Sequence, residues 1–137
     1  MTGRTRTCEE ALIAGRLRRA EQFLEAAEMI RELADDEHEL GDAYVTLWVH
    51  AGIAAADVIC CVALGVHALG EDHNEGLSLL GRVRPQGAEL AKVLAALLGM
   101  KTRAGYSALP VTVENRKRAT RQTERLVRAA RDRRTQP

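Results

Sequence analysis

The chain has 137 residues, 46% of them hydrophobic, which is long enough for one domain with one core and too short for two ordinary domains. Aromatic residues make up only 3% of the sequence, proline is rare, and Ala, Leu, Glu and Arg dominate. These residues favour helices, whereas a sheet would need more β-branched and aromatic residues. The composition therefore predicts an all-α protein. With the helix signals and the family resemblance described below, the expectation is an up-and-down bundle of four to five helices over residues 7–132, with disordered tails at 1–6 and 133–137.

The formal net charge of +1 conceals two segments of opposite sign. Residues 21–42 hold nine acids and the single base Arg31, whereas residues 113–137 hold nine Arg or Lys residues and three acids. Two surfaces of opposite charge are expected. They could attract each other within the bundle, pair between subunits, or leave the basic end free for an anionic partner.

The three cysteines are an odd number, and two of them, Cys60 and Cys61, are adjacent in an apolar segment. Adjacent residues of a helix point about 100° apart, so this spacing is not typical of a disulfide framework. We expect small buried thiols and a reducing compartment. The N-terminus lacks the apolar core of a signal peptide, which predicts a cytoplasmic protein.

The first helix is predicted to begin at Thr7, because the run Thr7-Cys-Glu-Glu10 matches a capping box. Residues 1–6 are then a loose basic tail. Apolar residues recur every three or four positions after Thr7, which predicts an amphipathic helix of roughly seven turns with a solvated acidic outer face. Its inner face is expected to hold Ile13, Leu17, Ala20, Leu24, Ala27 and Ala34.

The second helix is expected from about Gly41 to Leu69, with Gly70 as its stop, and is apolar on nearly every side. A membrane span is the alternative, but Asp57 near its midpoint would cost about 2.5–3.5 kcal/mol in a bilayer. We therefore expect the central helix of a soluble bundle. His50 and Asp57 lie on nearly the same face, about 10 Å apart by the helical rise. Both are predicted to be buried and bonded to neighbouring helices.

Two shorter helices are expected next. Asp72 is predicted to cap a helix that Pro85 ends, because proline cannot continue a helix. A fourth helix is expected from about Gln86 to Leu98, closed by Gly99. Residues 100–110 have no regular pattern and are expected to be irregular.

The final helix is expected to start with Thr112 as N-cap and to run to about Arg131. Its apolar stripe is thin, so most of the helix surface is predicted to be basic and exposed to solvent. The stripe consists of Ala119, Thr123, Leu126, Val127 and Ala130.

A basic ridge is predicted on this final helix. Lys117, Arg121 and Arg128 fall along one line, with Arg118 and Arg125 beside it. Such a stripe suits phosphate backbones. A solvated face, or one paired between subunits, fits the same residues.

The histidines do not predict a metal site. A di-metal bundle needs a Glu-x-x-His on each of two helices and a Glu from each of two more, whereas Asp35-x-x-His38 is the sole approximation here. His67 and His73 flank a turn and could approach each other, which is more typical of locally bonded side chains. No phosphate-binding Gly-rich loop, Cys-x-x-Cys pair or Ser elbow occurs. No cofactor is expected.

Three segments together resemble the HEPN superfamily, the nucleotide-binding helical domains of higher eukaryotes and prokaryotes. They are the Ala-rich run His50–Asp57, the turn and helix Asp72–Leu80, and the run Lys101-Thr-Arg-Ala-Gly-Tyr106 before a capped final helix. The resemblance covers about residues 8–131. It implies a closed helical bundle, a homodimer, and an anion or RNA contact at Lys101, Arg103 and Tyr106, beside Lys117, Arg121, Arg125 and Arg128.

Many HEPN proteins are metal-independent ribonucleases that use an Arg followed four to six residues later by a His. This sequence has no His after His73, so neither Lys101 nor Arg103 has that partner and the general acid–base step lacks its usual group. The resemblance therefore implies a non-catalytic binding or accessory protein that contacts RNA, nucleotide or a toxin–antitoxin-type partner encoded nearby, such as a nucleotidyltransferase. A degenerate ribonuclease, with Tyr106 as substitute acid, and a purely structural helical protein are the alternatives.

Overall fold

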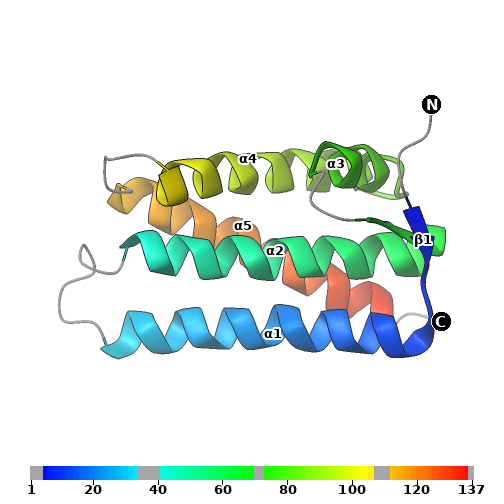
Figure 1. The fold of residues 1–137 in the computed structure, drawn as a ribbon, viewed down its shortest axis with the longest axis horizontal. Coiled ribbons are helices and arrows are strands. Elements are labelled where there is room, and N and C mark those ends of the chain that lie inside the picture. The colour runs from blue at the N-terminus through cyan, green and yellow to red at the C-terminus, as the bar shows by residue number, and fades with distance from the viewer. Residues whose placement is uncertain (1–4, 34–40, 70–72, 107–111, 136–137) are drawn as a thin grey trace.

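The computed structural model describes residues 5–33, 41–69, 73–106 and 112–135. Within these ranges it contains five helices and one small antiparallel sheet of two strands. The all-α class and the helical bundle are therefore confirmed. In Figure 1 the long helices α1, α2, α4 and α5 alternate in direction, and the short α3 lies beside the start of α4. The elements are β1 (Thr5–Thr7), α1 (Glu10–Leu33), α2 (Gly41–Leu64), β2 (Val66–Ala68), α3 (His73–Gly81), α4 (Gly87–Tyr106) and α5 (Val113–Thr135).

Helix α2 is the centre of the bundle and packs against α1, α4 and α5 (Figure 1). Its side chains are buried on most sides, which explains why its sequence is apolar in nearly every direction. Its fully enclosed residues include Val45, Trp48, Val49, Val58 and Ile59.

By length and composition, Ala43–Leu64 is the one segment among the described residues that could cross a membrane. The core helix of a soluble bundle meets the same criterion, and 61% of this segment's most apolar window is buried inside the molecule.

Helix α5 begins as the sequence predicts. The Thr112 hydroxyl accepts a 3.1 Å hydrogen bond from the Asn115 amide, and the Thr112 carbonyl accepts one of 3.0 Å from the Arg116 amide. The predicted apolar stripe is buried against α2 and α4, which confirms its assignment. The helix continues to Thr135, so the predicted tail is wrong for residues 133–135.

The predicted end of the second helix is wrong. Helix α2 ends at Leu64, and Gly65 has a φ of +78°, a left-handed conformation that glycine adopts without strain. The Gly65 amide donates to the Cys61 carbonyl at 2.9 Å, as expected of the residue after a helix. The chain then forms β2, whereas Gly70 lies outside the described residues.

The N-terminal segment also differs from the prediction. Residues Thr5–Thr7 form strand β1, which pairs antiparallel with β2, so residues 5 and 6 are not a loose tail. Thr7 belongs to this strand and cannot cap a helix. Helix α1 begins at Glu10, and the Glu9 carbonyl accepts the first helical bond from the Ile13 amide at 3.1 Å.

Cys8 and Cys61 are joined by a disulfide between residues 53 apart in the sequence, with Cα atoms 5.6 Å apart. The expectation of three free thiols is therefore wrong. The sequence argument weighed only the adjacent pair, but pairing of β1 with β2 brings Cys8 to the end of α2. The backbone supports the same junction, because the Cys8 amide donates to the Gly65 carbonyl at 3.0 Å.

Helix α3 ends at Gly81, four residues before Pro85, and α4 begins at Gly87. A side chain at Gly87 would bring its Cβ within 2.6 Å of the Leu80 carbonyl oxygen, so only glycine fits this turn without movement. The prediction that Gly99 ends the fourth helix is wrong. Helix α4 passes through Gly99 and continues to Tyr106, so residues 100–106 are helical and not irregular.

Candidate functional site

A cavity of about 240 Å³ lies at the end of the bundle where β1 and β2 meet α1, α2, α3 and α4. Most of its wall is apolar. Five polar side chains line it as well, each from a different element: Arg6 from β1, Arg16 from α1, Asp57 from α2, His67 from β2 and His73 from α3. A concave apolar pocket with a few convergent polar groups is the usual form of a ligand site.

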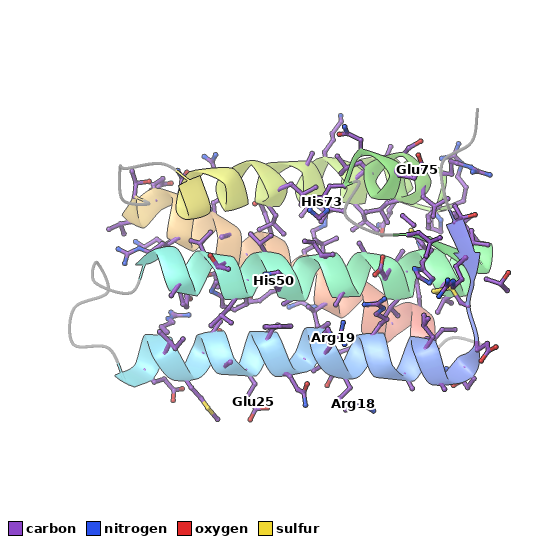
Figure 2. The ribbon with its side chains drawn as sticks, in the orientation of Figure 1. Arg18, Arg19, Glu25, His50, His73 and Glu75 are labelled. Atoms are coloured by element: carbon purple, nitrogen blue, oxygen red, sulfur yellow. A yellow bond between two sulfur atoms is a disulfide. The ribbon has the colours of Figure 1, made fainter. Side chains whose placement is uncertain are left out.

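Asp57 is the acidic group of this cavity. Its carboxylate lies 3.8 Å from the Nε of Arg16, and the two side chains are 21% and 31% exposed. Burial raises the pKa of Asp57 above its ordinary value, because the charged form loses water, while Arg16, His67 and Arg19 lower it in part. Asp57 is therefore half-buried rather than buried as predicted, and the neighbouring helix α1 supplies Arg16 as an ion-pair partner, at a distance longer than a hydrogen bond. Figure 2 shows Arg19 between α1 and α2, whereas Arg18 and Glu25 point outward from α1.

His67 is the most enclosed polar side chain of the cavity, at 3% exposure. Its Nδ1 lies 2.9 Å from the carbonyl oxygen of Ala68. A carbonyl only accepts hydrogen bonds, so Nδ1 carries a proton and donates it to this carbonyl. The buried Nε2 has no hydrogen-bond partner within the part of the chain that the structure describes.

Two further residues with reactive side chains line the cavity. His73 reaches it from α3 (Figure 2). Cys60 is buried beside the disulfide, and burial together with the charge of Asp57 raises the pKa of its thiol to about 12. A thiol with so high a pKa is a poor nucleophile, because the thiolate is the reactive form.

His50 does not belong to this cavity, and the prediction that it is buried is wrong. It is exposed, and its ring stacks on Phe23 of α1 with ring centroids 5.4 Å apart. Figure 2 shows it on the side of α2 that faces α1. The residues just before and after it, Val49 and Ala51, are fully buried. His50 therefore lies on the narrow strip of the α2 surface that is exposed to solvent.

Many cations of the basic final helix are occupied within the molecule. Arg125 binds Glu89 of α4 at 3.0 Å, Arg131 binds Glu21 of α1 at 3.6 Å, and Arg134 pairs with Glu10 of α1. Arg133 donates to the main-chain carbonyls of Arg84 and Pro85. Basic α5 and acidic α1 are therefore joined within the bundle.

A second group of α5 cations has no such contacts. Lys117, Arg118, Arg121 and Arg128 are exposed, and the structure gives them no acidic partner among the residues it describes. They lie on the side of α5 opposite the buried stripe. These four residues are called the free basic face below.

Several predicted site residues cannot be placed. Lys101, Arg103 and Tyr106 belong to the last turns of α4, but their side chains lie outside what the structure describes. Asp35 and His38 also lie outside the described residues. In the remainder of the chain, no three His, Cys, Asp or Glu side chains come together as a metal site would require.

Sequence reasoning missed Arg6 and Arg16 as members of a site. A signal existed for Arg16, which lies three residues after Ile13 and four before Ala20, next to the inner stripe of α1. A base there and an acid inside the central helix suggest an ion pair between the two helices. Arg6 gave no signal, because only the pairing of β1 with β2 brings it to the cavity.

No family model matches this sequence, and no curated protein is found that resembles it.

Proposed function

We propose that this protein is a non-catalytic, HEPN-like accessory protein that contacts the phosphates of RNA through the free basic face of α5. The observation that carries the proposal is the division of the α5 cations into two groups. Arg125, Arg131 and Arg134 are paired with acids, whereas the free basic face has no acidic partner among the described residues. Unpaired cations retain their full attraction for phosphate.

The dimensions of the face support the same proposal. Lys117 and Arg128 are eleven residues apart, which corresponds to about 16 Å along a helix. That length is sufficient to follow several phosphates of a strand. The face is also held in place, because the opposite side of α5 is buried against α2 and α4. Cations on a fixed helix lose less backbone conformational entropy on binding than those of a loose tail.

The test is the salt dependence of RNA binding to the full chain. For single-stranded RNA, each phosphate contact contributes about 0.7 to the slope of log K against log salt. The double variant Arg121→Ala/Arg128→Ala should therefore bind more weakly and lower the slope by about 1.4. Its melting temperature should stay close to that of the wild type, because both side chains are exposed.

Arg131→Ala/Arg134→Ala is the matched control. It removes two arginines from the same helix, but these two are paired with acids of α1. Its slope should match the wild type, with a small loss of stability of about 0.2–1 kcal/mol for each exposed ion pair. Equal slopes for the two double variants, or binding without salt dependence, would refute the proposal and favour a structural role.

Reproducible RNA cleavage would support the alternative, a degenerate ribonuclease. The sequence lacks a His after His73, so cleavage would need another acid. Cleavage that is retained with a chelator and lost in Arg103→Ala or Tyr106→Phe would replace the binding proposal with this alternative.

A further inference from the structure

The charged groups of the cavity near Asp57 are of two kinds. Arg6 and Arg16 can only donate hydrogen bonds, since a guanidinium has no acceptor. The Asp57 carboxylate can only accept them. A ligand that satisfies both kinds must itself carry acceptors and at least one donor.

Both kinds of group, the donors and the acceptor, are short of hydrogen-bond partners. Arg6 is exposed and has no acidic partner among the residues that the structure describes. Arg16 contacts Asp57 only at 3.8 Å, which is longer than a hydrogen bond. On the acceptor side, the same separation leaves the Asp57 carboxylate without a hydrogen bond from Arg16. A polar group that is shielded from water and lacks a hydrogen bond costs free energy, so a ligand that bonds to it is stabilised.

The volume of the cavity limits the size of the ligand. The cavity measures about 240 Å³. Pockets for drug-sized ligands span about 300–1,000 Å³. The ligand is therefore smaller than a typical drug-sized molecule.

We propose that this cavity binds a small oxyanion that also carries a hydrogen-bond donor, the chemistry shared by hydrogen phosphate and small hydroxycarboxylates. The anionic oxygens face Arg6 and Arg16, which suit carboxylate and phosphate because a guanidinium can bind them through two parallel hydrogen bonds. The hydroxyl of the ligand donates to the Asp57 carboxylate. Apolar side chains such as Ile53 and Leu94 form the rest of the wall.

The hydrogen-bond donor on the ligand is the most specific part of the proposal. An anion without one would place its oxygens against the lone pairs of Asp57. A site built to hydrogen-bond a hydroxyl rejects an analogue that lacks it, because the polar groups of the site are then left unpaired. The proposal is independent of RNA binding, because α5 contributes no residue to the lining of the cavity.

Two matched pairs of probes test the proposal by calorimetric titration of the full chain at neutral pH. Phosphate and lactate carry a hydroxyl donor, whereas sulfate and acetate do not. At least one of phosphate and lactate should bind tenfold or more tightly than its matched partner, and the one that binds identifies the source of the oxyanion. Absence of binding by both phosphate and lactate would refute the proposal, as would equal affinity within both pairs.

Arg16→Met and Arg18→Met locate the binding. Both variants remove a guanidinium from α1 and keep an unbranched apolar side chain, but Arg18 points away from the bundle (Figure 2). Arg16→Met should weaken binding at least tenfold, whereas Arg18→Met should leave it unchanged. Arg6→Met removes the other guanidinium from an exposed strand, so it provides the same test if Arg16→Met does not fold. Full affinity in folded Arg16→Met or Arg6→Met would show that the anion binds elsewhere.

Discussion

Thr123 of α5 donates a 3.0 Å hydrogen bond from its hydroxyl to the main-chain carbonyl of Trp48 in α2, and the hydroxyl is fully enclosed. The bond joins two helices through residues that are 75 positions apart in the sequence. A carbonyl has two lone pairs, so Trp48 can accept this bond in addition to a bond of its own helix. A polar residue in the apolar stripe of α5 is thereby satisfied, and it fixes the position of α5 along α2.

Thr123→Val should lower the free energy of unfolding by about 1 kcal/mol, the usual net contribution of one intramolecular hydrogen bond. Valine has nearly the same shape, so the packing is kept while the bond is lost. Urea unfolding monitored by circular dichroism measures the change. Thr135→Val is the control, because its hydroxyl bonds only the nearby carbonyls of exposed Arg131 and Asp132. Equal losses in the two variants would show that the bond to Trp48 contributes nothing specific.

Gly52 allows close packing at the junction of α2, α4 and α5. A Cβ at this position would lie 2.8 Å from Leu97 and 3.3 Å from Leu126. Overpacking of this kind costs about 1–3 kcal/mol, whereas alanine gains about 1 kcal/mol in helix propensity. Gly52→Ala should therefore be neutral to about 2 kcal/mol less stable in urea unfolding.

Gly99→Ala provides the comparison for Gly52. Gly99 is also inside a helix, but nothing lies within 4 Å of its added Cβ. Only the propensity gain then remains, and Gly99→Ala should be up to about 1 kcal/mol more stable than the wild type. If Gly52→Ala were stabilised as much as Gly99→Ala, the close packing at Gly52 would be disproved.

The helices themselves could be predicted because their signals are local. The cap at Thr112 and the three-four spacing of the apolar stripe on α5 depend only on residues close in sequence, and both are observed. Helix ends were less predictable. Gly99 continues a helix because burial of Leu97 and Met100 offsets its cost, whereas Gly65 ends one because the chain turns there to pair β2 with β1. Both causes are contacts between distant segments.

The cavity could be predicted only in part, for the same reason. A carboxyl inside the central helix indicated a partner from another helix, and Arg16 is found beside Asp57. The remaining walls of the cavity depend on the two-stranded sheet. Its strands have only three residues each, which is too short to be recognised in the sequence. His50 was misplaced because an almost uniformly apolar helix has no periodicity that marks its solvent-exposed side.

The disulfide between Cys8 and Cys61 should contribute strongly to stability. It closes a loop of 53 residues, for which the chain-entropy model gives about 4 kcal/mol. Cys8→Ala should melt at a markedly lower temperature than the oxidised wild type. Reductant should lower the melting temperature of the wild type to about that of Cys8→Ala and leave the variant unchanged. A wild type insensitive to reductant, and free of a linked peptide in mass spectrometry, would show that the bond does not form.

Cys60 should resist alkylation in the folded protein. With a thiol pKa of about 12, only about one molecule in ten thousand holds a thiolate at pH 8, and the side chain is buried. Incubation with iodoacetamide without reductant should leave Cys60 unmodified for hours by intact mass, while the same reagent in urea should label one site. Rapid labelling of the native protein would contradict the burial of this thiol.

Asp57 should make stability fall as pH rises. Burial raises its pKa in the folded state above the ordinary 3.8 of the unfolded chain, so the folded protein holds this proton more tightly. The stabilisation is complete below pH 3.8 and is lost as pH increases through the folded-state pKa. Asp57→Asn cannot ionise, so its stability relative to the wild type should increase from pH 3 to pH 8.

Arg16 allows the cause of this effect to be tested. Its charge lowers the pKa of Asp57, so Arg16→Met should raise that pKa further and steepen the loss of stability with pH. Arg18→Met, on the outer face of α1, should follow the wild type (Figure 2). Urea unfolding at five pH values for the four proteins measures both effects. A difference between Asp57→Asn and the wild type that stays constant with pH, or shrinks as pH rises, would mean that the folded protein does not disfavour the charge on Asp57.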